Sequence, residues 1–268
     1  MSHELVQLTL QGPVASVRLH RPEVHNAFDS QLIAELTTHF EQLALAAPIR
    51  VVVLSGAGRS FCAGADLNFM QRVAGFTREE NLADARALFR MFSVLESCPK
   101  PTIARVHGAA LGGGMGLVAA CDIVVASRAA RFGFTEARLG LAPAVISPFV
   151  VRRIGPGPAR ELFLTARQFS ADEAFRLGLV HRVAEDDHLD DEVQGILADL
   201  LRGAPGAHSA CKRLLAEISP LEPRLEAFTT SLIAELRASD EGREGMQAFF
   251  ERRPAAWVVE PLPRTEVV

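Results

Sequence analysis

The chain has no long apolar run and no strong excess of charge of either sign. No stretch approaches the roughly 18 uninterrupted apolar residues of a membrane-spanning helix, and polar residues throughout the first ten positions do not resemble a signal peptide. The 28 basic and 32 acidic side chains leave a formal net charge of −4, too small to indicate a nucleic-acid-binding surface. We therefore expect a cytoplasmic protein that binds neither membranes nor nucleic acid.

Cysteines are few, and several common motifs are missing. The four cysteines show no paired metal-ligand spacing and fit reduced thiols, so no metal site is expected. No Gly-Lys-Ser/Thr follows a glycine-rich loop, the glycine spacing does not give the dinucleotide fingerprint, and Gly-x-Ser-x-Gly does not occur. These absences argue against a P-loop, a dinucleotide site and an α/β-hydrolase nucleophile.

What the chain does have is a dense glycine cluster at residues 112–116 (Gly-Gly-Gly-Met-Gly), directly after a strand-like run at 101–107. Glycine permits positive φ and lets the backbone approach a ligand closely. A helix that starts there would point unpaired N–H groups and the positive end of its dipole at whatever the loop faces. Such a loop can supply a backbone donor for developing negative charge, or it can be only a tight strand-to-helix connection.

A second glycine-rich connection lies earlier in the chain. The β-branched run at 51–54 predicts a buried strand, and a glycine-containing loop leads from it to residues 62–67 (Cys-Ala-Gly-Ala-Asp-Leu). In this order, the two segments closely resemble the signature loops of the crotonase superfamily, the enoyl-CoA hydratase/isomerase family.

The resemblance extends over nearly the whole chain. The matching segments are 21–28 (Arg-Pro-x-x-x-Asn-Ala-Phe), 121–123 (Cys-Asp-Ile), 132–140, 162–180 and 249–254. The resemblance implies an α/β fold, a crotonase-like spiral of ββα turns, with a C-terminal helical region that packs in trimer contacts.

The hydrophobic periodicity is compatible with such an architecture. It predicts a hairpin at 5–10 and 14–19, a helix capped by Asp29 or Ser30, and a helix from about 80 to 97. From Leu189 onward the pattern is purely helical. We place an acyl-CoA-binding and catalytic core in residues 1–200 and a helical oligomerisation region in residues 201–268. The expected assembly is a homotrimer or a dimer of trimers.

The chemistry shared by the family is stabilisation of a thioester enolate by two backbone N–H groups. The resemblance places these donors on Ala65 and Gly113, and each such donor is typically worth about 3–4 kcal/mol of barrier. Coenzyme A would be part of the substrate, so no separate cofactor is expected. The resemblance places substrate and coenzyme A contacts at Glu23, Val24, Ala63, Asp66, Leu67, Gly112 and Phe250. For two of these residues a purely structural role is the alternative: Asp66 can be a helix N-cap, and Phe250 a plain helix end.

Acid–base groups decide the reaction. Family hydratases commonly carry two glutamates, and this chain has Gly116 at one position and Glu136 at the other. A carboxyl group that faces an apolar acyl pocket should have a raised pKa, which suits a group that both gives and takes a proton. A family dienoyl isomerase or aryl dehalogenase would need an aspartate where this chain has Ala144, so these two activities are set aside.

Residues 140–151 refine the resemblance toward a bacterial branch that includes 3-methylglutaconyl-CoA hydratases of leucine catabolism and isohexenylglutaconyl-CoA hydratases. That branch also tends to have Gly-Leu, as in Gly116-Leu117 of this chain, where other hydratases have Glu-Leu. The leading hypothesis is an enoyl-CoA hydratase acting on a 3-methylglutaconyl-CoA-type thioester. A Δ3-Δ2 enoyl-CoA isomerase with one glutamate and a low-turnover acyl-CoA-binding protein remain as alternatives.

A glutaconyl-type substrate carries a distal carboxylate, so its pocket should contain a cation or a cluster of donors. The segment between the two loops holds Arg72, Arg78 and Arg86. We favour Arg86 because residues 81–86 (Asn-Leu-Ala-Asp-Ala-Arg) resemble a piece of the glutaconyl-type branch. The alternative is a helix-surface arginine paired with Asp84 or Glu80.

Overall fold

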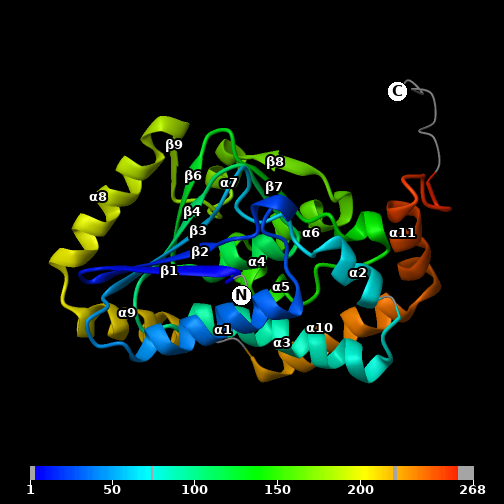
Figure 1. Ribbon diagram of the computed structural model, residues 1–268, viewed down its shortest axis with the longest axis horizontal. Helices are drawn as coiled ribbons and strands as arrows, with labels where there is room; N and C mark the ends of the chain where they lie inside the picture. Colours follow the sequence, from blue (N-terminus) through cyan, green and yellow to red (C-terminus); the bar gives the residue numbers. More distant parts are fainter. Residues whose placement is uncertain (1–3, 74, 220–221, 259–268) are drawn as a thin grey trace.

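The computed structural model describes residues 4–73, 75–219 and 222–258 and shows an α/β fold (Figure 1). The strands are β1 (Val6–Gln11), β2 (Val14–Leu19), β3 (Val51–Gly56), β4 (Thr102–Val106), β5 (Ala109–Leu111), β6 (Ile123–Ser127), β7 (Arg131–Gly133), β8 (Gln168–Ser170) and β9 (Arg182–Ala184). The α-helices are α1 (Ser30–Leu45), α2 (Leu67–Val73), α3 (Arg78–Ser97), α4 (Gly113–Ala120), α5 (Ser147–Ile154), α6 (Pro156–Thr165), α7 (Ala171–Arg176), α8 (Leu189–Arg202), α9 (Pro205–Ile218), α10 (Pro223–Ala238) and α11 (Asp240–Phe250). Short 3-10 helices are η1 (Pro22–Val24), η2 (Glu136–Leu139) and η3 (Asp186–His188).

The larger sheet has six strands in the order β1-β2-β3-β4-β6-β9. Strands β1 and β2 form the antiparallel hairpin that the sequence predicts, and the remaining neighbours are parallel. A smaller sheet of β5, β7 and β8 lies beside it and carries the glycine-rich loop at the end of β5.

Strand β3 is buried on both faces, which explains its unbroken apolar run. Val52 and Leu54 belong to the main core beneath α1 and α3, whereas Val51 and Val53 pack with residues of α8 on the other face. A strand covered on both sides shows no polar–apolar alternation. The sequence pattern and the packing therefore agree.

Helix starts are fixed by short polar side chains. The Asp29 carboxylate accepts a hydrogen bond from the Leu32 N–H at 2.8 Å and caps α1. Thr77 and Glu80 form a reciprocal capping box, so α3 begins at Arg78, two residues before the predicted start.

Within the described residues, no helix is both long enough and apolar enough to cross a membrane.

The C-terminal helices return to the core. Helix α10 packs against α3 (Figure 1), and its Ile233 joins the main hydrophobic cluster. Helix α11 packs against η2. Helix α9 carries no buried residue, and its Leu214, Leu215 and Ile218 are more than half exposed. The expected boundary at residue 200 lies in the last turn of α8, and the functional division between the two segments stays a prediction.

Candidate active site

The two glycine-rich segments meet at backbone contact. The Cys62 N–H donates to the Ala109 carbonyl at 3.0 Å, and the Leu111 N–H donates back to the Cys62 carbonyl at 2.9 Å. Gly64 has a φ of +94°, and a Cβ there would lie 3.1 Å from the Leu111 carbonyl oxygen. A side chain at this position would strain the backbone and crowd the neighbouring loop, so glycine allows the two loops to approach.

This pairing leaves two N–H groups facing one cavity. Phe28 donates to the Gly64 carbonyl at 2.7 Å and accepts from the Asp66 N–H at 2.8 Å, so the Ala65 N–H between them faces the other way. Gly113 is the first residue of α4, where N–H groups have no intrahelical acceptor. Within the described chain neither N–H donates to another protein group, and both residues line the same cavity.

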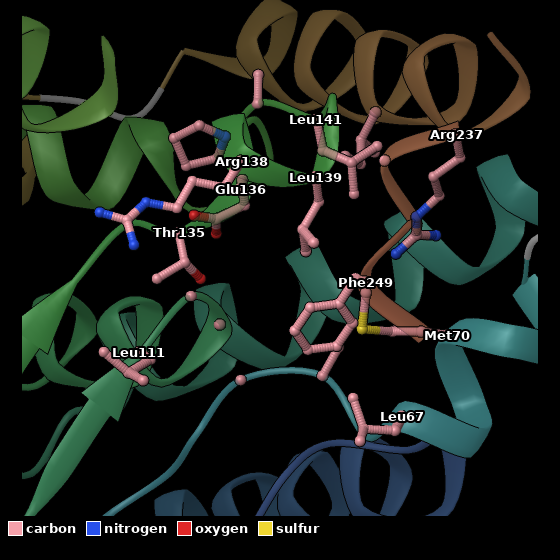
Figure 2. Close-up of a pocket in the computed structure, with 18 of the residues that line it drawn as sticks. Leu67, Met70, Leu111, Thr135, Glu136, Arg138, Leu139, Leu141, Arg237 and Phe249 are labelled. Atoms are coloured by element: carbon pink, nitrogen blue, oxygen red, sulfur yellow. The ribbon is translucent and has the colours of Figure 1, made fainter. Parts of the chain in front are cut away.

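The cavity has a volume of about 790 Å³ and is mostly apolar (Figure 2). Its walls come from α2, α3, η2, the segment after η2, α10 and α11. The principal apolar lining residues are Met70, Leu88, Leu141, Val145, Ile233 and Phe249.

Glu136, the first residue of η2, projects into this cavity beside the glycine-rich loop (Figure 2). Its Oε1 lies 3.5 Å from the place that a Cβ on Gly112 would occupy. Its Oε2 is shielded from solvent and has no hydrogen-bond partner within the described residues. Burial raises the pKa of the Glu136 carboxyl to about 7, because desolvation disfavours the charged form. The group can therefore hold or release a proton near neutral pH.

The position of the second family glutamate is closed by apolar side chains. A Cβ on Gly116 would lie 2.6 Å from Ile146 Cγ2 and 2.6 Å from Phe92 Cζ. Both neighbours are buried in the main core. The surroundings of Gly116 are thus built for a glycine and leave no room for a carboxylate side chain.

Comparison with known proteins identifies the family. The model of the enoyl-CoA hydratase/isomerase family matches residues 9–260. The chain belongs to this family. It is 32% identical over 261 residues to a crotonyl-CoA hydratase of Syntrophomonas wolfei, covering 96% of this chain and 99% of that relative. It is 33% identical over 251 residues to a short-chain-enoyl-CoA hydratase of Clostridium acetobutylicum, covering 92% and 95%.

The fold is also that of the family. The crystal structure of an enoyl-CoA hydratase from Shewanella pealeana matches with a TM-score of 0.79 and 40% identity, covering 96% of this chain and 97% of that one. An enoyl-CoA hydratase from Mycobacterium avium matches with a TM-score of 0.85 and 33% identity over 96% of this chain and 100% of that one. The predicted α/β crotonase-like fold and family membership are confirmed.

Some of the remaining predicted contact residues line the cavity, and the others lie outside its lining. Ala63, Leu67 and Gly112 line the cavity. Asp66 is buried, and its carboxylate accepts from the Phe69 N–H at 3.0 Å, so this residue caps α2 as the alternative interpretation had it.

Glu23 and Val24 lie in η1, outside the residues that line the cavity, and Glu23 is exposed. Phe250 is also outside that lining; its neighbour Phe249 is the aromatic residue of α11 that faces the cavity (Figure 2).

The structure does not place Arg86 in the cavity. Asp84 and Leu88, four residues apart on α3, both line it, whereas Arg86 is exposed. Residues i and i+4 share a helix face and the residue midway between them points away. The expectation that Arg86 supplies the pocket cation is therefore wrong for this chain. Asp84 pairs instead with Arg237 of α10, at 2.7 Å.

Two further contributors were not assigned a role from the sequence. Asn26 is fully buried, and its Nδ2 donates to the carbonyls of Ala57 and Ser60 at 2.8 and 2.7 Å. It thereby holds the loop that leads to Ala65. Gly245 of α11 packs so tightly on η2 that a Cβ there would lie 2.4 Å from the Leu139 carbonyl. Helix α11 thus fixes the short helix that carries Glu136.

Proposed function

We propose that this protein is an enoyl-CoA hydratase, which adds water across the double bond of an α,β-unsaturated acyl-CoA. The observation that carries the proposal is the half-buried Glu136, whose shielded Oε2 has no partner within the described residues, beside two backbone N–H groups that likewise have no acceptor there, all lining one mostly apolar cavity. The similarity to a crotonyl-CoA hydratase and a short-chain-enoyl-CoA hydratase supports the same reaction.

The proposed mechanism uses these groups in turn. The N–H groups of Ala65 and Gly113 hold the thioester oxygen, where negative charge develops as hydroxide adds to Cβ. Rigid backbone donors suit this task because they are oriented before the charge appears. Glu136 takes a proton from the attacking water and delivers one to Cα, so the elements of water are added in full. A pKa of about 7 suits both transfers at neutral pH.

The proposal extends to the substrate and the assembly. A 3-methylglutaconyl-CoA-type thioester is favoured by the sequence of residues 140–151, whose Leu141 and Val145 line the cavity. Coenzyme A is part of this substrate, and the addition of water requires no oxidant or reductant. A homotrimer or a dimer of trimers, located in the cytoplasm, is the proposed assembly, and the exposed apolar face of α9 offers a surface for such contacts.

A Δ3-Δ2 enoyl-CoA isomerase is the second candidate. It is favoured by the closed, apolar surroundings of Gly116, because one carboxyl group suffices to move a proton between Cα and Cγ. An acyl-CoA-binding protein with little turnover would use the same cavity without proton transfer.

Three substrates separate these candidates. Crotonyl-CoA and 3-methylglutaconyl-CoA should lose the absorbance of the conjugated thioester if the protein is a hydratase. A 3-enoyl-CoA should gain that absorbance if it is an isomerase, and no change with any substrate would leave only binding. A wild type that prefers crotonyl-CoA would overturn the glutaconyl assignment.

The variant Glu136→Gln tests the acid–base group. Glutamine keeps the shape but cannot exchange a proton, so turnover should fall by at least ~10²-fold while acyl-CoA binding persists. Glu79→Gln, at an exposed position on α3, is the matched control and should remain fully active. Retained activity in Glu136→Gln would assign the proton transfer to another group.

A further inference from the structure

An ion pair lies in the wall of this mostly apolar cavity. Asp84 of α3 and Arg237 of α10 are joined at 2.7 Å, their side chains are only 9% and 13% exposed, and both line the cavity. Figure 2 shows the Arg237 guanidinium directed toward Met70 and Phe249, on the far side of Leu139 from Glu136. A charged group therefore sits at the end of the cavity away from the acid–base group.

Holding α10 on α3 does not require this pair. Ile233 of α10 already joins the main core one helical turn before Arg237, and Arg78 pairs with Glu235 on the outside of the same two helices. Bringing two charges out of water costs several kcal/mol per ion, and well-packed apolar residues commonly stabilise such a site as well or better. A buried pair inside a ligand cavity therefore points to a ligand.

Arg237 has donors left for that ligand. A guanidinium carries five N–H groups, and within the described residues Arg237 makes one hydrogen bond, from Nη1 to Asp84 Oδ2. The other arginines of the cavity wall differ: Arg138 is exposed, and Arg253 is held by Glu244 and Glu251. Arg237 is thus the most enclosed of these cations, and its fork geometry matches a carboxylate.

We infer that Arg237, oriented by Asp84, binds a carboxylate at the distal end of the acyl group and so selects acyl-CoA thioesters of dicarboxylic acids. The inference rests on the proposed function only in taking this cavity as the acyl-CoA site. Arg237 is a binding residue here, and Asp84 is a positioning residue that acts through it.

Binding of unreactive thioesters tests the inference without turnover. Pentanoyl-CoA and glutaryl-CoA have acyl chains of equal length that end in a methyl group and a carboxylate. Trp257, the single tryptophan of a chain without tyrosine, lines the cavity and reports binding by its fluorescence. The wild type should bind glutaryl-CoA about tenfold or more tighter than pentanoyl-CoA, because hydrogen bonds to charged groups are the strong ones.

Three variants make the assignment. Arg237→Met should abolish the preference for glutaryl-CoA and leave pentanoyl-CoA binding within about threefold, whereas Arg86→Met, on the exposed side of α3, should keep the full preference. Asp84→Asn should keep or increase it, because the asparagine oxygen can still accept the hydrogen bond that orients Arg237, while the negative charge that competes with the ligand carboxylate is gone. If Arg237→Met does not fold, the double variant Asp84→Leu/Arg237→Met removes both charges and should show the same loss.

Equal affinity of the wild type for the two thioesters would overturn the inference, as would a preference that survives Arg237→Met. Parallel losses for both thioesters in Arg237→Met and Asp84→Asn would reveal a purely structural pair and would overturn it too. Failure of the proposed function is seen separately: a protein that prefers glutaryl-CoA through Arg237 but neither hydrates nor isomerises any enoyl-CoA retains the inference and loses the enzyme assignment.

Discussion

Glu136 should make the stability of the folded protein depend on pH in a way that Glu136→Gln removes. Burial raises the pKa of its carboxyl from 4.5 to about 7. Below pH 4.5 the group is neutral in both the folded and the unfolded chain, and folding carries no penalty from it. Between pH 4.5 and 7 the folded protein keeps a proton that the unfolded chain has released, so the free energy of unfolding falls as pH rises.

The size of this loss follows from the shift. One pKa unit corresponds to 1.36 kcal/mol, so the full difference is about 3 kcal/mol, and partial access of solvent to the Glu136 side chain lowers the expectation to about 1–3 kcal/mol. Glutamine does not titrate, so Glu136→Gln should gain this amount relative to the wild type between pH 5 and pH 8.

Urea unfolding of both proteins at pH 5 and pH 8 measures the effect, at one fixed protein concentration because association also changes apparent stability. Glu79→Gln, which changes an exposed glutamate, should track the wild type at both pH values. A difference between wild type and Glu136→Gln that is the same at pH 5 and pH 8 would refute a desolvated Glu136.

Three glycines give further expectations. Gly113→Pro removes the proposed oxyanion donor and should lower turnover by ~10²–10³-fold. Any Cβ at this position would lie 2.7 Å from the Phe28 ring, so a loss of activity could also come from this contact. Gly113→Ala makes the same contact but keeps the N–H, and as the control it must retain clearly more activity. Gly116→Glu should cost about 2–4 kcal/mol in the free energy of unfolding, measured with urea, because its side chain enters a filled apolar site. Wild-type stability would contradict the close packing of Ile146 and Phe92 around Gly116. Gly245→Ala should push α11 away from the Leu139 carbonyl, lower turnover about tenfold and shift the tryptophan fluorescence, and unchanged activity would separate α11 from the positioning of η2.

Local patterns predicted most of the core. The hairpin of β1 and β2 follows from two strand-like runs around a turn, and the Asp29 cap marks the start of α1 one residue ahead of the helix. The unbroken run in β3 indicates a strand buried on both faces, and two clusters do cover it. These features depend on neighbouring residues in the chain, so the sequence carries them directly.

The walls of the cavity depend on residues far apart in the chain, and there sequence reasoning failed. Asp84 and Arg237 are separated by 153 positions, and no local pattern indicates that α10 returns to α3. The choice of Arg86 came from a short resemblance, although helical geometry turns that residue away from Asp84 and Leu88. Phe249 rather than Phe250 faces the cavity for a similar reason: at a helix end, one residue of rotation decides which side chain points inward.

The cavity holds two carboxyl groups in opposite environments, and the contrast assigns their tasks. Among the described residues, no cation pairs with Glu136 and its Oε2 has no hydrogen-bond partner, so its carboxyl is free to exchange a proton with a ligand in the proposed reaction. Asp84 is bound to Arg237. It lies eight residues before Phe92, one of the side chains that pack around Gly116, on the same helix α3. At 1.5 Å per residue, this places Asp84 about 12 Å along the helix from Phe92. Asp84 therefore does not stand in for the missing glutamate. Under the proposed function, proton transfer then falls to Glu136 alone, and the proposed task of Asp84 is to hold Arg237 where the acyl chain ends.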